Sequence, residues 1–181
     1  VTSRANRYRV LKKLTDRDSL TGLLNHANIL RYLERELSVA DRAGRPVSFA
    51  MIDIDHFKKV NDTYGHAVGD QVILRMTHLI RDRMRRIDYV GRYGGEEFAV
   101  VMPNTDAEGA YAVVEQLRLA AMDVIHKADG GREFHVTFSA GIATYPNHPT
   151  TLALTQAADD ARYEAKSGGR NRVVTAPSAR A

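Results

Sequence analysis

A predicted β-hairpin over residues 85–103 constrains the fold of this chain more than any other segment. Apolar and polar residues alternate on both sides of Gly94 and Gly95, which is typical of antiparallel strands joined by a tight turn. We expect these glycines to adopt positive φ angles and to leave room for a ligand beside the backbone. Glu96 and Glu97 follow, and the apolar run 98–102 then predicts a buried strand. Paired carboxylates beside backbone amides suit a metal-bound phosphate ester, although an ordinary turn with solvated glutamates has the same pattern.

A second apolar run, residues 47–52, ends in Asp53. A buried strand that ends in an acid, next to a hairpin whose tip carries acids, is expected to bring Asp53 and Glu96 together. Carboxylate oxygens are the ligands that Mg²⁺ prefers in proteins. The two segments together therefore predict a site for a divalent cation.

Several motifs occur in the same order as in a known family. Residues 18–25 match D-x-L-T-G-L-x-N, residues 53–62 read DIDHFKKVND, residues 85–88 form R-x-x-D, and residues 166–171 form K-x-x-G-R-N. Together with the Gly-Gly-Glu-Glu turn, these motifs resemble the GGDEF domain of the diguanylate cyclase family, here in the GGEEF variant. The resemblance extends from about Asp18 to Val174, which is nearly the whole chain.

The length of the chain bounds its organisation. Its 181 residues allow one domain with a short extension. We expect residues 1–17 to end an upstream signalling or linker helix, residues 18–175 to form the GGDEF catalytic domain, and residues 176–181 to be a disordered tail. Because the first residue is Val1 rather than methionine, we expect a fragment of a longer protein.

The composition restricts the location and the partners. The chain has no cysteine, which excludes disulfides and thiolate metal sites and favours a cytoplasmic location, for example as the output domain of a larger sensor. No apolar run approaches the roughly 20 residues needed to span a bilayer, so we expect no membrane contact by this fragment. The net charge of +4 favours polyanionic ligands such as nucleotides. No zinc-finger spacing or basic–aromatic motif is present, and we therefore expect no nucleic-acid partner.

Apolar periodicity predicts the helices. The first is expected to begin after an Asn25 cap and to end at Gly44. Its buried stripe is predicted to contain Ala27, Leu30, Leu33, Leu37 and Ala40. A second helix is expected to carry apolar residues from Val72 to Ile87.

Two more helices and a strand complete the expected fold. Thr105 and Glu108 predict a capping box at the start of a third helix, and residues 152–166 predict a fourth. Alternating apolar residues from Phe134 to Ile142 predict one core strand between them. The resulting order of elements indicates an α/β (α+β) sandwich with a mostly antiparallel sheet flanked by helices. The resemblance implies a palm-like, ferredoxin-related core.

The resemblance also implies the catalytic and metal-binding residues. In the family, the positions of Asp53, Glu96 and Glu97 are catalytic. Together with the carbonyl of Ile54 they hold Mg²⁺ or Mn²⁺, with two ions expected per site.

A nucleotide site is implied by the same matches. The backbone amides of His56, Phe57 and Lys58 are expected to contact the phosphates in a tight turn. Asn61 and Asp70 are expected to recognise guanine, because an aspartate there would stay unpaired against adenine. The remaining substrate contacts are expected from Gly94, Gly95, Lys166 and Arg170. Without the resemblance, Asn61 and Asp70 would be polar residues near a helix start, and the two basic residues would favour a helix dipole.

Arg85 and Asp88 correspond to the family's inhibitory site for the product. An arginine can bind guanine O6 and N7 with two hydrogen bonds, whereas the simpler interpretation is an i,i+3 ion pair. A second arginine that the family often supplies is replaced here by Gln116, and Arg118 falls on a different helical face. This departure predicts weaker product inhibition.

The implied activity is that of a diguanylate cyclase, which condenses two GTP molecules into cyclic di-GMP and releases two pyrophosphates. Each domain would hold one GTP, so catalysis requires a homodimer in which two sites face each other. One alternative is a catalytically silent sensor that binds cyclic di-GMP through Arg85 and Asp88. A cyclase that accepts ATP is another, which Asp70 disfavours.

Overall fold

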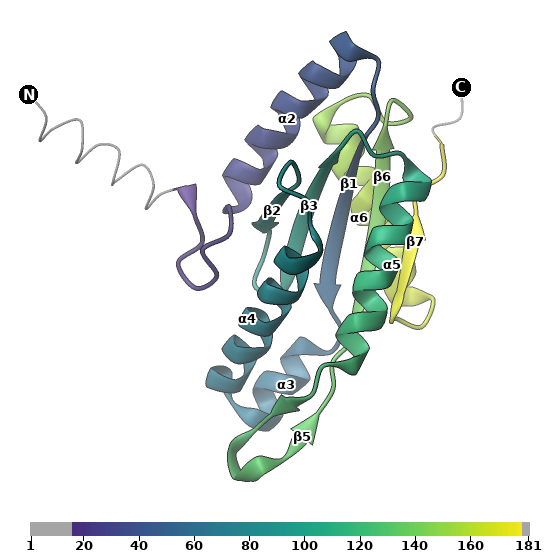
Figure 1. Ribbon diagram of the computed structural model, residues 1–181. Helices are drawn as coiled ribbons and strands as arrows, with labels where there is room; N and C mark the ends of the chain where they lie inside the picture. The colour runs from purple at the N-terminus through teal and green to yellow at the C-terminus, as the bar shows by residue number, and fades with distance from the viewer. Residues whose placement is uncertain (1–15, 179–181) are drawn as a thin grey trace, which may run out of the picture.

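The computed structural model describes residues 16–178, and Figure 1 shows a central sheet flanked by helices. Five strands form the sheet in the order β2-β3-β1-β6-β7. Their bounds are β1 Val47–Ile54, β2 Tyr89–Arg92, β3 Glu97–Pro103, β6 Phe138–Tyr145 and β7 Arg172–Thr175. The pairs β1–β3, β1–β6 and β2–β3 are antiparallel, and only β7 at the edge runs parallel to its neighbour. The predicted mostly antiparallel α/β sandwich is therefore confirmed.

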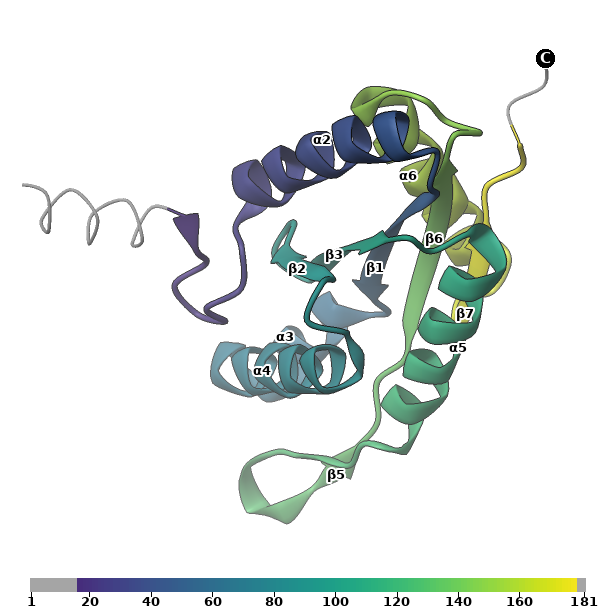
Figure 2. The ribbon, with the colours of Figure 1, turned by 45° about the horizontal axis from the view of Figure 1, so that its top comes forward.

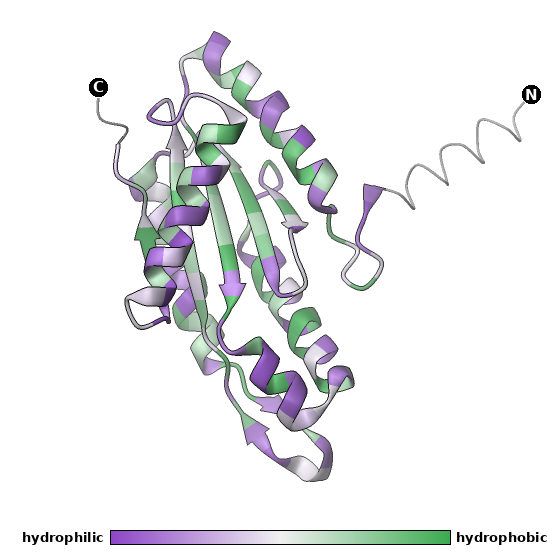
Figure 3. Cartoon of the chain, turned by 180° about the vertical axis from the view of Figure 1, so that it is seen from behind, coloured by the Kyte–Doolittle hydropathy of each residue, from purple (hydrophilic) through white to green (hydrophobic). Residues whose placement is uncertain are grey.

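Helices cover both faces of the sheet, as Figure 2 shows. They are α2 His26–Ala43, α3 Phe57–Tyr64, α4 His66–Arg83, α5 Ala107–Asp123 and α6 Thr151–Ser167. One core cluster joins α4 and α5 to residues such as Ile52 and Val100, while the other joins α2 and α6 to Phe49 and Val101. Because side chains alternate across a strand, β1 and β3 supply both clusters. Hydrophobic colour covers most of the central strands in Figure 3.

The first helix begins and ends where the sequence predicts. The Asn25 side chain accepts a hydrogen bond from the Asn28 amide, and Gly44 ends α2 with a left-handed φ of 63°. The predicted stripe is partly wrong, since Ala27 is exposed and Leu30 is only half-buried. Ile29 takes their place, in a buried row with Leu33, Leu37 and Ala40.

Two other helix boundaries differ from the prediction. The second helix ends at Arg83, and Ile87 lies beyond it with 48% of its surface exposed. The cap of α5 is Asp106, whose side chain accepts from the Gly109 amide, so the predicted Thr105–Glu108 capping box is wrong. Thr105 Oγ1 instead accepts a hydrogen bond from Arg85 and donates to the Pro103 carbonyl.

The predicted strand from Phe134 to Ile142 is two strands. A small hairpin, β4 His126–Lys127 and β5 Glu133–Phe134, turns through Gly130 and Gly131, which both have positive φ. The chain then crosses to β6, which starts at Phe138. This hairpin projects past the sheet beside α3 in Figures 1 and 2, and Phe134 stacks on Tyr64 of α3 at 4.3 Å.

His126 in this hairpin predicts a pH dependence of stability. Burial, with Arg75 and His135 nearby, lowers the pKa of His126 from 6.5 to about 4. The unfolded chain therefore binds a proton near pH 6.5 that the folded chain resists, so His126 contributes full stability above pH 6.5 and loses it as the pH falls toward 4. The free energy of unfolding should fall by up to about 1.4 kcal/mol per pH unit in this window. In urea titrations between pH 7 and pH 4, a His126→Phe variant should show a shallower dependence; an unchanged slope would contradict the assignment.

Helix α6 approaches β6 most closely at Gly141. A Cβ atom there would collide with the backbone of Ala158, Ala161 and Arg162. The buried face of α6 accordingly consists of the small residues Ala158, Ala161 and Ala165, apart from Leu154. This contact fixes the distance of α6, and of the polar residues on its next face, from the sheet.

The expected linker helix lies mostly outside the described residues. At the other end, the Ala176 amide donates to the Ile142 carbonyl, and the Pro177 carbonyl lies 3.1 Å from His148 Nε2. Residues 179–181 of the predicted tail are again outside the described part. Among residues 16–178, no helix is long and apolar enough to cross a membrane.

Candidate active site

The end of β1 and the Gly-Gly turn lie side by side. Asp53 is the register partner of Glu97 across the β1–β3 pair, and the Ile54 amide donates to the Glu96 carbonyl at 3.2 Å. The turn itself closes through the Tyr93 amide, which donates to the Glu97 carbonyl at 2.8 Å. The predicted proximity of Asp53 to the paired glutamates follows directly from this register.

The expected backbone of the turn is wrong, since neither Gly94 nor Gly95 has a positive φ. Gly94 is required for a different reason: a Cβ there would lie 3.1 Å from Glu97 Oε1. A Cβ at Gly95 would meet open space. A glycine is therefore favoured at position 94 because the Glu97 side chain folds back over the turn.

Arg92 supports the turn from below. Its Nε and Nη2 donate to the Gly95 carbonyl at 3.2 and 2.9 Å, and its Nη1 lies 3.1 Å from Asp18 Oδ1. Burial opposes ionisation of Asp18, but hydrogen bonds from Thr21 and the charge of Arg92 outweigh it and lower the Asp18 pKa. The first motif of the chain is thereby connected to the hairpin tip through one arginine.

Asp53 is buried and is held by two basic residues of α6. Its side chain is 4% exposed. Arg162 Nη1 lies 2.7 Å from Oδ2, and Lys166 Nζ lies 2.8 Å from Oδ1. The lysine contact is an ion pair without hydrogen-bond geometry, so Oδ1 has no directional hydrogen bond. Lys166 thus lies beside the carboxylate, and Arg162 is a contact that the sequence analysis did not predict.

The acids around Asp53 form a cluster with incomplete charge compensation. Burial is the main cause that raises the Glu97 pKa, Arg162 opposes it, and the charges of Asp53, Glu96 and Asp159 raise it further. Within residues 16–178, no three Asp, Glu or His side chains converge as a ready metal cage. The Asp53 oxygens instead face Arg162 and Lys166 of α6. Asp53, Glu96 and Glu97 offer only carboxylate oxygens, and their negative charge suits a hard divalent cation.

Asp55, two residues further along the chain, connects three segments. Its carboxylate accepts from Ser139 Oγ and Thr137 Oγ1, both at 2.7 Å, and from the Asn171 amide at 3.0 Å. Asn171 directly follows Arg170 in the loop after α6, and its Oδ1 accepts from Arg118 of α5 at 2.8 Å. Asp55 therefore fixes the position of the K-x-x-G-R-N loop relative to β1.

Removing this carboxylate should be costly. An Asp55→Ala variant leaves two hydroxyls and one amide without their acceptor, and we expect a loss of about 2–4 kcal/mol of unfolding free energy. The exposed Asp62 of α3 provides the control, since Asp62→Ala should change stability by less than about 0.5 kcal/mol. Equal denaturation midpoints for the two variants would contradict this role of Asp55.

The residues predicted to recognise guanine lie on two neighbouring helices. Asn61 is on α3, a short helix that was not predicted, and Asp70 is exposed on α4. Asn61 Oδ1 is buried without a hydrogen-bond partner, and a Cβ at Gly69 would collide with it. Gly69 therefore makes room for the Asn61 side-chain amide next to Asp70.

The predicted phosphate contacts approach from two ends of the structure. His56 precedes α3 with a left-handed φ of 55°, and Phe57 and Lys58 form the first turn of that helix. Such first-turn amides have no partner within their helix. Arg170 is exposed, with a φ of 63°, in the loop after α6. The structure thus brings both segments to the same end of β1, next to Asp53 and Asp55.

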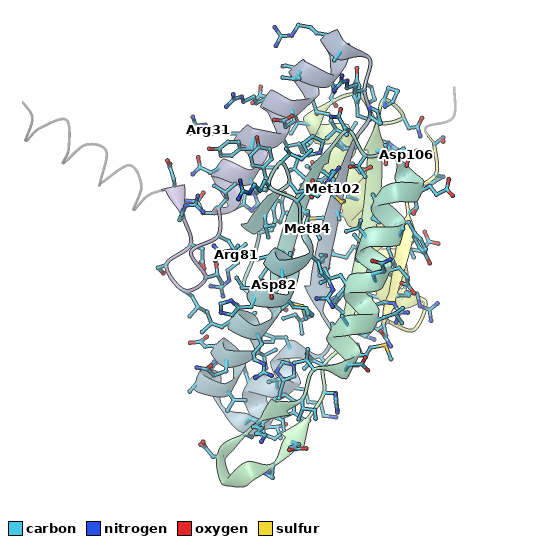
Figure 4. The ribbon with its side chains drawn as sticks, viewed as in Figure 1. Arg31, Arg81, Asp82, Met84, Met102 and Asp106 are labelled. Atoms are coloured by element: carbon cyan, nitrogen blue, oxygen red, sulfur yellow. The ribbon has the colours of Figure 1, made fainter. Side chains whose placement is uncertain are left out.

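Arg85 and Asp88 lie apart from this site, after the end of α4. Asp88 accepts from the Arg85 amide and from Nε and Nη2, and Nη2 also donates to Thr105 Oγ1. The arginine remains 51% exposed. Grooves on its two sides are lined by residues that include the labelled pairs in Figure 4, namely Arg81 and Met84 on one side and Met102 and Asp106 on the other.

Comparison with known proteins settles the family. The family model described as diguanylate cyclase, GGDEF domain, matches residues 15–172. The chain belongs to the GGDEF family. It is 42% identical over 159 residues to the response regulator PleD of Caulobacter vibrioides. The aligned part covers 87% of this chain and 35% of PleD. The chain is 38% identical over 156 residues to diguanylate cyclase DosC of Escherichia coli K12, covering 86% and 34%. The chain thus spans about a third of the length of these relatives.

Solved GGDEF domains have the same fold. The coiled coil and GGDEF domain of DgcB from Caulobacter crescentus, solved in complex with c-di-GMP, gives a TM-score of 0.90 at 31% identity, covering 97% of this chain and 95% of that chain. The active GGEEF domain of a diguanylate cyclase from Vibrio cholerae gives 0.79 at 31% identity, covering 86% and 98%. The predicted resemblance to the GGDEF family is confirmed.

Two residues of this GGDEF domain were missed from its sequence. Arg162 lies four residues before Lys166, and such residues share one helix face. The expectation that Lys166 faces the site therefore contained a signal for Arg162. Asp55 lies two residues after Asp53, on the same face of the extended chain. Its partners Thr137 and Ser139 were hidden in a strand that was treated as core alone.

Proposed function

We propose that this GGDEF domain is a catalytic unit that condenses two GTP molecules into cyclic di-GMP. In each of two steps, the ribose 3′-oxygen of one GTP attacks the α-phosphorus of the other and loses its proton. The bond between the α-phosphorus and the bridging oxygen breaks, and pyrophosphate leaves. Catalysis of such a transfer depends mostly on positioning and on the neutralisation of charge.

The observation that carries this proposal is the buried Asp53 carboxylate, which lies beside the Glu96–Glu97 turn and within 2.8 Å of Lys166. A carboxylate pair suits metal ions, and a lysine at the same point suits phosphate oxygens. A structural ion pair would explain Asp53 and Lys166, but it would not explain why Glu97 lies where burial and the charges of Asp53, Glu96 and Asp159 raise its pKa.

The residues present fit the divalent cation that the family implies. Asp53 Oδ1 is buried without a hydrogen bond, and burial together with the neighbouring carboxylates raises the pKa of Glu97. Asp53, Glu96, Glu97 and the Ile54 carbonyl would hold Mg²⁺ or Mn²⁺, with two ions in each site. When bound, the metal supplies charge neutralisation and lowers the pKa of the 3′-hydroxyl.

The remaining residues position the nucleotide. Asn61 and Asp70 bind the guanine edge, and the unpartnered Asn61 Oδ1 supports this role because it is an acceptor without a donor. The amides of His56, Phe57 and Lys58 hold the terminal phosphates. Gly94 and Gly95 leave room for the nucleotide at the turn, and Lys166 and Arg170 neutralise the phosphate charge.

One site holds one GTP, so a homodimer with facing sites performs the reaction. Incubation with GTP and Mg²⁺ over a range of protein concentrations, followed by chromatography, tests this. The rate of cyclic di-GMP formation should rise with about the square of the protein concentration while the dimer is a minor species. A rate strictly proportional to protein over the whole range would contradict assembly from monomers.

Arg85 and Asp88 bind the product and inhibit the enzyme in this proposal. The support is geometric: Asp88 and Thr105 hold the guanidinium in a fixed orientation while half of the side chain stays exposed. If GTP is not converted at any protein concentration but cyclic di-GMP binds, the domain is a sensor rather than an enzyme.

A further inference from the structure

Arg162 occupies the candidate metal site but has no part in the proposed chemistry. Its Nη1 lies 2.7 Å from Asp53 Oδ2, and its side chain is 16% exposed. On its other side, Nη2 and Nε lie 2.7 and 3.0 Å from Asp159 Oδ1. One guanidinium therefore bridges a buried carboxylate of β1 and a carboxylate three residues earlier on α6.

The contact of Arg162 with Asp53 can break at low cost while its contact with Asp159 remains. Nε and Nη2 hold Asp159 independently of Nη1, so the arginine keeps an ion pair when Nη1 leaves Asp53. The Asp159 side chain is 45% exposed, which leaves the released arginine close to water. A buried arginine that lost all its ion-pair partners would instead carry a large desolvation penalty.

Asp53, in contrast, is too deeply buried to lose its positively charged partner without a replacement. Its side chain is 4% exposed, and Glu96, Glu97 and Asp159 add negative charge nearby. Lys166 contacts one oxygen and Arg162 contacts the other. A divalent cation that uses Oδ2 must therefore displace Nη1, and the positive charge of the arginine opposes its approach.

We propose that Arg162 is a built-in counter-ion, which holds Asp53 in the metal-free domain and which a divalent cation displaces toward Asp159. It thus lowers the metal affinity of the site and stabilises the domain without metal. This inference rests on the proposed function, in which Asp53 is a metal ligand. Arg162 is a positioning residue in it, since it acts through Asp53 and contacts no reacting atom.

The test is a titration of Mn²⁺ by calorimetry in the presence of 3′-deoxy-GTP, which lacks the attacking hydroxyl and cannot react. We expect Arg162→Gln to bind Mn²⁺ about tenfold more tightly than the wild type. The metal-free variant should also unfold at a lower temperature, and its Tm should rise more on addition of Mn²⁺. Both readouts are independent of catalysis.

Two control variants separate this effect from a general change of charge. Arg42→Gln removes an exposed positive charge from α2, where the side chain donates to the Ser38 carbonyl, and it should leave the Mn²⁺ affinity unchanged. Arg162→Lys keeps the positive charge and should bind Mn²⁺ with nearly the wild-type affinity.

The outcomes are distinct. Equal Mn²⁺ affinities for the wild type and Arg162→Gln would overturn the inference, and so would weaker binding by the variant, which would make Arg162 a nucleotide ligand. An Asp53→Asn variant is titrated in parallel. If it binds Mn²⁺ as tightly as the wild type, Asp53 is no metal ligand and the proposed function fails at its centre. If it loses Mn²⁺ while Arg162→Gln matches the wild type, only the role of Arg162 is wrong.

Discussion

Replacing Glu96 by alanine is expected to abolish the formation of cyclic di-GMP without unfolding the domain. Within residues 16–178 the Glu96 side chain makes no ion pair or hydrogen bond, and only its carbonyl accepts from the Ile54 amide. The fold therefore loses little, and the free energy of unfolding should change by less than about 0.5 kcal/mol. The loss of a metal-binding carboxylate should slow the reaction about a thousandfold or more.

The matched control is Glu34→Ala on the exposed side of α2, which should retain full activity. Chromatographic assays of both variants with GTP and Mg²⁺ measure the rate, and urea titrations measure the stability. Binding of cyclic di-GMP should survive in Glu96→Ala, because Arg85 and Asp88 lie in a separate place. A Glu96→Ala variant that still produces cyclic di-GMP at the wild-type rate would show that the metal assignment is wrong.

Adding one methyl group at Gly141 should have the largest effect on stability. The new Cβ would meet the Ala161 carbonyl carbon at 2.8 Å and would also collide with Ala158 and Arg162. These atoms belong to a helix backbone that cannot rotate away, so α6 must shift as a whole. We expect Gly141→Ala to lose about 3 kcal/mol of unfolding free energy, at the upper end of ordinary overpacking.

Gly95→Ala is the control for this change, because its Cβ would meet no atom within 4 Å. Both variants replace glycine by alanine, but only Gly141→Ala should lower the free energy of unfolding. Urea denaturation of the two variants measures this difference. A shift of α6 would also move Arg162 and Lys166 away from Asp53, so folded Gly141→Ala should bind Mn²⁺ more tightly than the wild type, as Arg162→Gln should. Similar stabilities for the two variants would mean that α6 is not held at the distance that the structure shows.

The sequence predicted the parts of the site that depend on local patterns. Alternation fixed the hairpin, and an acid at the end of an apolar run placed Asp53 at the end of a strand next to the turn. Asn25 and Gly44 marked the ends of the first helix because their roles involve only neighbouring residues. These features need no knowledge of the tertiary structure.

The errors arise where a tertiary contact overrides a local preference. Thr105 fits a capping box by spacing, but its hydroxyl bonds to Arg85, and Asp106 caps the helix instead. Gly94 suggested a positive φ, whereas the folded-back Glu97 side chain is what excludes a larger residue. Ile29 replaced Ala27 in the buried row because the packing of α2 on β2 and β3 sets its rotation.

The ion pair between Asp53 and Arg162 also has a consequence for the order in which the domain matures. Its two residues are 109 positions apart, so a ribosome releases the acidic half of the site long before the basic half. Until α6 has packed on the sheet, Asp53 lies beside the paired glutamates without Arg162 and Lys166. Contacts of such long range form late and slowly. A nascent or truncated chain that lacks α6 therefore carries repelling carboxylates at the end of β1 without the cations that balance them.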